Sequence, residues 1–289
     1  MARAIQSFFH RKGRIGYLFV LPWLIGFAVF TAYPVFYSLY LSFFQVRITS
    51  QGIDTVYAGL ANYQRALVSD VTFVRQLGSY FLQTAVSVPL IVIFALMIAL
   101  LLNRPIRFRG WFRTIFFLPV IISSGPVLAK LIEQKVTSIP AIEQNLFYRL
   151  AEDYRGLLVT DLFLFIMDNM IVLFWFSGVQ ILIFIAALQK SDKLIYEAAR
   201  IDGASGWEMF WKVTLPGMAP MIVINIVYTT VMYSISSLNP IIEQIKTQMF
   251  KAETGFGYAS ALSWVYFVAI AALLAALTGL TAYFRAKKK

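Results

Sequence analysis

The chain of 289 residues is too apolar and too weakly charged to fold as a water-soluble protein. Hydrophobic residues make up 60% of it and charged residues only 13%, against about 45–50% and about 25% in ordinary globular domains. Its mean hydropathy is +0.73, so its surface requires lipid. Cysteine is absent, which excludes disulfides and thiolate chemistry, and the single histidine, His10, cannot supply a metal site or a catalytic triad alone.

Six segments are long and apolar enough to cross a bilayer, which takes about 20 mostly apolar residues. The first follows a basic stretch, but it is too long for a signal peptide and no small-residue cleavage site follows it. We therefore expect a retained helix that kinks at Pro22 and Pro34. The six expected spans are 15–44, 77–102, 111–132, 164–188, 216–237 and 258–284.

The basic residues are distributed unevenly, and this predicts the orientation. Sixteen of the 25 Lys and Arg residues lie on one side, four each in the N-terminal segment, the second-to-third connection, the fourth-to-fifth connection and the tail. Only four of the 14 acidic residues share that side. The positive-inside rule then puts both termini in the cytoplasm. The net charge of +11 is thus expected to set the topology and to allow contacts with lipid headgroups, and not to bind nucleic acid.

The connection between the fourth and fifth expected spans predicts two short helices with a sharp bend. It reads SDKLIYEAARIDGASGWEMFWKVTLPGMAP, from 191 to 220. Ser191 is expected to cap a first helix that begins at Asp192. Gly203 would end that helix in a left-handed conformation.

The second short helix and the next span have their own start signals. Ser205 and Glu208, three residues apart, predict a capping box. Pro216 is expected as the first helical residue of the fifth span. The first short helix has apolar residues on one face, namely Leu194, Ile195, Ala198 and Ile201. A helical hairpin of this kind at the membrane face suits the transmission of force from a soluble partner.

This segment resembles the EAA signature of permease subunits of bacterial binding-protein-dependent ABC importers. Three other stretches are similar to the carbohydrate-uptake branch, namely GLANYQRAL at 59–67, FRTIFFLPV at 112–120 and GYASALS at 257–263. One stretch departs from that branch: many sugar permeases carry GGP…T after the fifth span, where this chain has SLNPIIEQIKTQMF. The resemblance therefore names no particular sugar. The residues that match the signature are Glu197, Ala198, Ala199, Asp202, Gly203, Ala204, Phe210, Leu215 and Pro216.

The resemblance implies an all-α, six-span permease of the type I ABC importer architecture in the bacterial inner membrane. Residues 1–289 would form one transmembrane domain, one half of a permease heterodimer that works by alternating access. A second permease subunit, two ATPase copies and an extracytoplasmic substrate-binding protein would complete it. Residues 191–216 would form the coupling loop that docks on the ATPase, with Glu197 meeting a basic residue there. The chain lacks a phosphate-loop motif, so we expect no catalysis and no cofactor on it, with ATP and Mg on the ATPase subunits.

Polar side chains on the fifth expected span predict a substrate path. At about 100° per residue they fall on one side of a helix, here called the polar stripe. Hydroxyls and amides exchange hydrogen bonds with sugar hydroxyls, although hydrogen bonding between helices is the alternative. Trp175 could stack on a sugar, but it projects away from the polar arc, so helix or lipid packing is at least as good an interpretation. The stripe comprises Asn225, Tyr228, Thr229, Tyr233, Ser236 and Asn239, and Ser177, Gln180 and Trp175 are the fourth-span candidates.

The positions of the ionisable residues help to distinguish ATP-driven import from other modes of transport. No acid–base chain stands at the span centres, which counts against a proton-coupled carrier. Lys130 could meet an acidic sugar if it faces the cavity, although a pair with Glu133 is favoured. The sequence thus favours ATP-driven import of a carbohydrate, with an oligosaccharide preferred. Import of another solute and transport without ATP stay open as alternatives.

Overall fold

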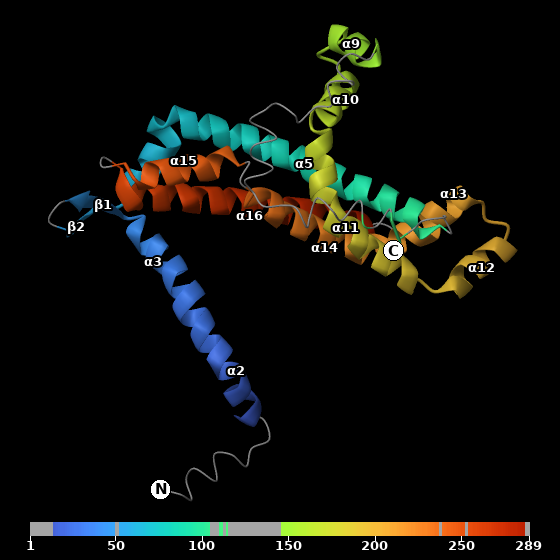
Figure 1. Ribbon diagram of the computed structural model, residues 1–289, viewed down its shortest axis with the longest axis horizontal. Helices are drawn as coiled ribbons and strands as arrows, with labels where there is room; N and C mark the ends of the chain where they lie inside the picture. The colour runs from blue at the N-terminus through green and yellow to red at the C-terminus, as the bar shows by residue number, and fades with distance from the viewer. Residues whose placement is uncertain are drawn as a thin grey trace, which may run out of the picture. The chain divides into compact units, whose positions relative to one another are not determined.

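Helices make up most of the described chain in the structure, a computed structural model (Figure 1). It describes residues 14–49, 52–104, 110, 111, 114, 146–236, 239–251 and 254–286. Apart from residues 111 and 114, the third expected span lies outside these residues, as do Lys130 and Glu133. The backbone contacts group the chain into two compact units, Met1–Val74 with Gln244–Tyr266, and Arg75–Glu243 with Phe267–Lys289.

Five of the described helices are long and apolar enough to cross a membrane, and each corresponds to one of the six expected spans. A helix suits this environment because it satisfies its backbone hydrogen bonds internally. The number six and the orientation of the termini stay predictions. The five candidate spans are Phe19–Leu41, Val71–Asn103, Val172–Lys190, Gly206–Ser234 and Gly255–Tyr283.

The first candidate span continues through both of its prolines. Pro22 lies within α2, and Pro34 lies in the first turn of α3. Between them the Tyr33 N–H bonds five residues back to the Ala28 carbonyl. Such a π turn shifts the hydrogen-bond register just before the proline that lacks a donor. The three segments are α2 (Arg14–Phe27), η1 (Ala28–Ala32) and α3 (Tyr33–Leu41).

A β-hairpin follows, which we did not predict from the sequence. Strand β1 (Phe44–Thr49) pairs antiparallel with β2 (Gly52–Tyr57). The extension of the first span to residue 44 was therefore wrong. The amide Nδ2 of Asn62 donates to the Ser42 and Phe44 carbonyls, each at 2.9 Å, and closes the base of the hairpin. The β-branched residues of VRIT and IDTVY are the strand signal in this stretch.

Asp70 joins the start of α5 (Val71–Asn103) to the start of α16 (Gly255–Ala286). One carboxylate oxygen accepts the Phe73 N–H at 2.9 Å and so caps α5. The other accepts the Tyr258 hydroxyl of α16 at 2.8 Å. The Arg65 guanidinium, in η2 (Arg65–Ser69) after the short α4 (Ala61–Gln64), lies 4.8 Å from the centre of the Tyr258 ring. These contacts hold η2, the start of α5 and the start of α16 together.

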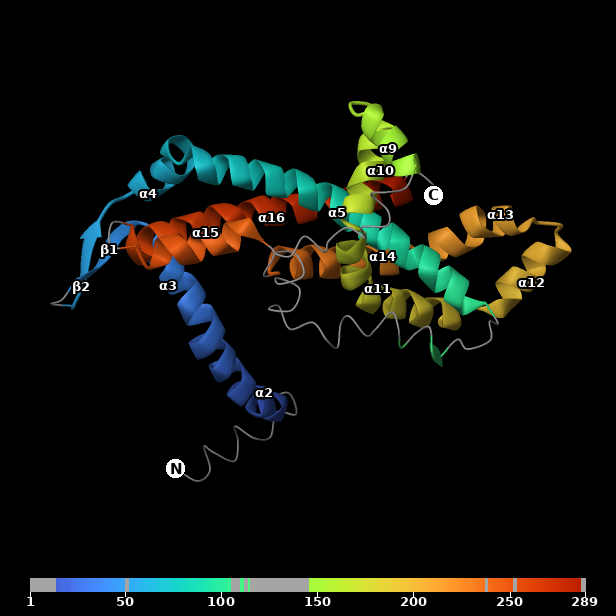
Figure 2. The ribbon, with the colours of Figure 1, turned by 45° about the horizontal axis from the view of Figure 1, so that its top comes forward.

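An apolar core lies among the described residues of the second unit. Helices α5, α11 (Met170–Lys190) and α14 (Leu215–Ser234) supply its buried side chains. Leu274 and Leu277 of α16 pack against it. Figure 2 shows α11 and α14 running beside each other next to α5. The core members include Val88, Val92, Ala95, Ile181, Phe184, Ile185, Met218 and Ile226.

The fourth expected span, 164–188, is not one helix as predicted. It breaks at Asn169, where α10 (Leu158–Asp168) ends and α11 begins. The Asn169 side chain donates to the Phe165 carbonyl at 2.9 Å, and such local bonds compete with helix continuation. Asp168 accepts the Tyr148 hydroxyl at 2.7 Å, which ties α9 (Leu146–Asp153) to α10 (Figure 2).

A glycine in α16 permits close approach of the hairpin. A β-carbon at Gly257 would overlap the Phe44 carbonyl oxygen and lie 3.2 Å from the Leu41 carbonyl oxygen. We expect Gly257→Ala to destabilise the protein by about 1–3 kcal/mol because backbone atoms must shift. The unfolding temperature of the detergent-purified protein measures this. Gly279→Ala in the same helix meets nothing within 4 Å and is the control. Equal unfolding temperatures for the two variants would contradict the prediction.

Candidate functional site

The hairpin of α12 (Lys193–Ile201) and α13 (Gly206–Met209) lies at the ends of α11 and α14 (Figure 1). Asp192 caps α12, because its carboxylate accepts the Leu194 N–H at 2.9 Å. The prediction of Ser191 as the cap was wrong by one residue. Ser191 instead closes α11, with its hydroxyl 3.4 Å from the Ala187 carbonyl. We call residues 191–216 the coupling hairpin.

The bend after α12 is a complete Schellman motif, which confirms the predicted left-handed glycine. Gly203 has φ +79°, and its N–H donates to the Arg200 carbonyl at 3.0 Å. The Ala204 N–H donates to the Ala199 carbonyl at 2.9 Å. These two bonds satisfy carbonyls that a helix end leaves open. The second alanine of EAA and the GA of DGA are therefore the two ends of one turn.

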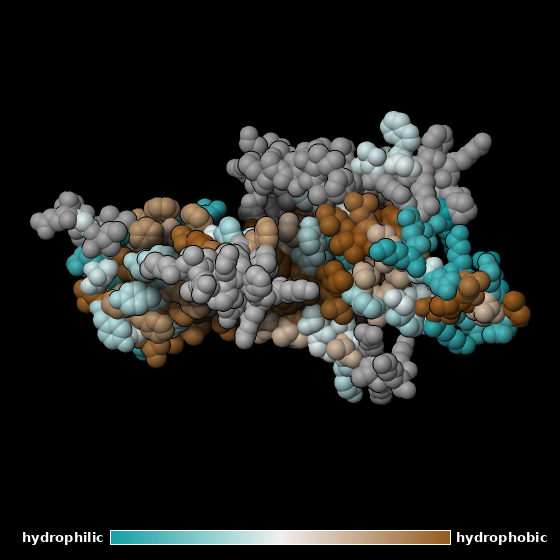
Figure 3. Space-filling view, turned by 90° about the horizontal axis from the view of Figure 1, so that it is seen from below, coloured by the Kyte–Doolittle hydropathy of each residue, from teal (hydrophilic) through white to brown (hydrophobic). Residues whose placement is uncertain are grey.

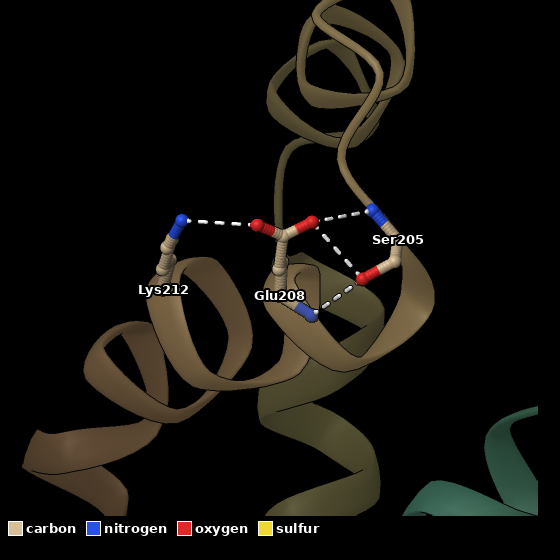
Figure 4. Close-up of polar contacts among 3 residues, drawn as sticks. All are labelled: Ser205, Glu208 and Lys212. Carbon is tan, nitrogen blue, oxygen red and sulfur yellow. Dashed lines mark hydrogen bonds and ion pairs between the residues drawn. The ribbon is translucent and has the colours of Figure 1, made fainter.

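The predicted capping box at the start of α13 is confirmed (Figure 4). The Glu208 N–H donates to the Ser205 hydroxyl at 3.3 Å, and the Ser205 N–H donates to the Glu208 carboxylate at 3.0 Å. The other oxygen of this carboxylate accepts the Lys212 ammonium at 3.2 Å. These bonds define the exit from the bend.

The second short helix runs into the fifth span without a break. A π segment, η3 (Phe210–Thr214), connects α13 to α14. Within it the Leu215 N–H reaches five residues back to the Phe210 carbonyl. Pro216 is thus the second residue of α14 inside a continuous helix, and not the start of a separate span as predicted. The π turn takes up the change in hydrogen-bond register before the proline.

The coupling hairpin presents an apolar face to its surroundings. Leu194 is 68% exposed, Ile195 54% and Ile201 87%, and these are three of the four residues predicted to share one helix face. Glu197 and Ala198 are exposed between them, and Ala199 is half-buried. Figure 3 shows hydrophobic and hydrophilic surface side by side where α12 and α13 lie. A mixed surface of this kind suits a protein partner.

The polar stripe faces the inside of the second unit. Gln180 of α11 donates to the Thr229 hydroxyl of α14 at 2.9 Å, and both side chains are buried. Asn225, one turn before Thr229, is fully buried. Among the described residues, neither Nδ2 nor Oδ1 of Asn225 has a hydrogen-bond partner, and Oε1 of Gln180 also has none. Buried amides of this kind need partners, which water or a ligand supplies.

Two members of the stripe do not belong to the helix. Helix α14 ends at Ser234, so the projection of Ser236 and Asn239 onto it was wrong. From here on, the polar stripe means the residues that α14 does carry, Asn225, Tyr228, Thr229 and Tyr233. Asn239 instead precedes α15 (Pro240–Met249), and its carboxamide oxygen accepts the Ile241 N–H at 2.9 Å as a helix cap.

The remaining candidates take different positions. Ser177 is buried, and its hydroxyl donates to the Phe174 carbonyl of its own helix at 2.9 Å. Tyr228 and Trp175 are half-buried. Tyr233 is buried, and the Phe176 ring of α11 packs on it with centroids 5.2 Å apart.

Helix α5 adds polar residues that we did not select from the sequence. The Tyr80 hydroxyl donates to the Tyr233 carbonyl at 2.9 Å, and the two rings stack with centroids 5.9 Å apart. Ser87 and Gln83 are hydrogen-bond partners of the Tyr233 hydroxyl. Tyr80, Gln83, Thr84 and Ser87 have the spacing of one helix face, and this signal was available in the sequence.

Comparison with known proteins gives one family over most of the chain. Residues 66–288 match the family described as binding-protein-dependent transport system inner membrane component. The lactose transport system permease protein LacF of Rhizobium radiobacter is 31% identical over 219 residues, 75% of this chain and 71% of that protein. The arabinooligosaccharides transport system permease protein AraP of Halalkalibacterium halodurans is 30% identical over 220 residues, 74% and 66% of the two chains.

The fold also matches a solved structure. A chain of a bacterial alginate ABC transporter, crystallised in complex with an alginate pentasaccharide-bound periplasmic protein, superimposes with a TM-score of 0.63. The match covers 90% of this chain and 91% of that one at 20% identity. At that identity the likeness concerns the fold.

The Gln180–Thr229 bond yields a prediction about stability. Thr229→Val leaves the Gln180 amide unsatisfied, so we expect a loss of about 1–3 kcal/mol. Thr229→Val combined with Gln180→Leu removes both partners and should recover much of that loss. Unfolding temperatures of the detergent-purified variants give the comparison. Thr230→Val is the control, because that hydroxyl bonds the Ile226 carbonyl of its own helix. Additive losses in the double variant would show that the bond does not couple the helices.

Proposed function

Because the chain belongs to the family of binding-protein-dependent transport system inner membrane components, we propose that it is the permease subunit of an ATP-driven carbohydrate importer. In this proposal it pairs with a second permease subunit in the inner membrane, and alternating access exposes its polar stripe to either side. An extracytoplasmic binding protein delivers the substrate. ATP and Mg bind to two ATPase subunits, and the chain itself carries no catalytic site.

The coupling hairpin is the observation that carries the proposal. The Schellman bend and the capping box hold Glu197 and Ala198 on an exposed helix with an apolar face. A carrier that works without ATP has no need of such a docking element between two spans. We assign the contact with the ATPase to Glu197, Ala198, Ala199, Asp202, Gly203 and Ala204, with Leu215 and Pro216 at the junction with the span.

The chemistry of the buried stripe supports a neutral polar substrate. Asn225, Thr229 and Gln180 offer amide and hydroxyl groups, and two of these residues have unpartnered polar atoms within the described chain. Such groups match sugar hydroxyls. The relatives at 31% and 30% identity are named for lactose and for arabinooligosaccharides. Import of another solute by the same machine is the alternative, and uptake assays with each solute class separate the two.

The bend gives the test of the coupling assignment. Gly203→Val forces a β-branched residue into a left-handed conformation at about 1–2 kcal/mol. We expect Glu197→Ala and Gly203→Val to weaken association with the ATPase or abolish uptake while the chain still inserts in the membrane. Co-purification of the ATPase and ATP-dependent uptake are the measurements. Gly156→Val is the matched control, since Gly156 also has a positive φ, +102°, outside the hairpin. Normal uptake by both hairpin variants would refute the assignment.

The stripe gives the test of the substrate path. Single cysteines at Asn225, Thr229 and Tyr233 should react with a water-soluble thiol reagent, because a path must admit water. The chain has no native cysteine to confuse the labelling. ATP and the loaded binding protein should change the rates. Cysteines at the exposed positions Ile224 and Val231 of the same helix provide the comparison. Uniform inertness along the stripe, in resting and ATP-bound complexes, would rule out the path.

A further inference from the structure

One side-chain contact links the coupling hairpin to the fifth span. The Tyr196 hydroxyl of α12 lies 3.1 Å from the Thr214 hydroxyl of η3. Tyr196 directly precedes Glu197, and Thr214 lies two residues before Pro216. Thr214 is buried and Tyr196 is half-buried. The contact thus joins the helix that carries the docking residues to the π segment at the base of α14.

The direction of this hydrogen bond follows from its neighbour. The Thr214 hydroxyl also lies 3.3 Å from the Met209 carbonyl, to which it donates. A carbonyl oxygen can only accept, so the single Thr214 proton is used there. Tyr196 is therefore the donor to Thr214. The result is a chain of two hydrogen bonds, from Tyr196 through Thr214 to the backbone of α13, in which each bond polarises the next.

Two open grooves flank the contact. Tyr196 and Thr214 both line a groove of about 340 Å³, together with Ile195 and Met218. Both also line a second groove of about 600 Å³, with Glu197 and Leu100. Because space lies beside the contact, α12 can shift relative to the spans with little disruption of packed side chains. The hydrogen bond then decides how much of that shift reaches η3.

The π segment is a point where the long helix departs from regular α-helical hydrogen bonding. Its hydrogen bonds run five residues back, and Pro216 follows with no N–H to donate. Kinks and functional hinges concentrate at π turns and prolines. Beyond this point α14 continues as an α-helix, with Pro220 inside it, to the polar stripe, about 22 Å from Thr214 to Thr229 at 1.5 Å per residue. A rotation imposed at η3 is carried along that helix.

We propose that Tyr196 is a positioning residue that ties the coupling helix to the π segment, so that movement of the hairpin turns the polar stripe. The proposal rests on the proposed function of the hairpin. Tyr196 acts through Thr214, and its role is transmission of movement, separate from docking by Glu197.

The test uses the complete complex with its second permease and ATPase subunits, and Asn225→Cys as reporter on the stripe. The probe is a charged, membrane-impermeant methanethiosulfonate, with labelling of this chain read from a gel. In the parent reporter we expect ATP plus vanadate to change the labelling rate several-fold relative to no nucleotide. Tyr196→Phe and Thr214→Val should each cut that change to less than half, without loss of ATPase co-purification or basal ATP hydrolysis.

Three further variants distinguish the loss of the Tyr196–Thr214 hydrogen bond from a change in side-chain shape. Thr214→Ser keeps the hydroxyl and should therefore show the same nucleotide-dependent change in labelling rate as the parent. The double variant Tyr196→Phe/Thr214→Val should be no worse than either single variant, because both remove the same bond. Ser191→Ala removes a hydroxyl that bonds its own helix and should respond as the parent does.

A parental nucleotide response in Tyr196→Phe would overturn the proposal. So would loss of the ATPase from that variant, because the hydroxyl would then shape the docking surface. An ATPase-bound parent complex without any nucleotide response would overturn it as well. If the parent chain neither retains an ATPase nor supports ATP hydrolysis, the proposed function itself fails, which is a distinct result.

Discussion

Backbone polar groups in a lipid-facing chain must find partners within the chain, and this requirement bears on the irregular points of its helices. Before two of the prolines a π turn reaches back one residue further, at η1 before Pro34 and at η3 before Pro216, whereas Pro22, Pro89 and Pro220 lie inside α-helices. Where α10 ends, the Asn169 side chain covers a carbonyl. These points and the prolines inside the helices are the places where the helices can change direction.

The sequence predicts features that depend on composition or on near neighbours. Span positions follow from runs of apolar residues, and five of the six find a matching helix among the described residues. The bend at Gly203 and the Ser205–Glu208 box depend on bonds that reach at most five residues, so their residue types identify them. Their geometry could be derived before the structure.

Features that depend on tertiary packing or on backbone register could not be derived in this way. Projection of the polar stripe assumed one unbroken helix, and the end of α14 at Ser234 removes Ser236 and Asn239 from it. The sequence predicted Ser191 as the cap of α12, whereas Asp192 caps it. Both residue types can cap a helix, and only the backbone path determines which of them does. The polar face of α5 was readable at Tyr80, but only the packing of helices shows that it meets Tyr233.

The exposed apolar face of α12 affects how the cell treats a subunit that has not yet assembled. The side chains of Leu194, Ile195 and Ile201 are mostly exposed, since the rest of the described chain covers little of their surface. A subunit made in excess of its partners would present this apolar helix to chaperones and proteases, which act on exposed apolar segments. Assembly would hide it. If this face docks on the ATPase as proposed, subunits without partners would be degraded, and the amount of this protein would follow the amounts of its partners.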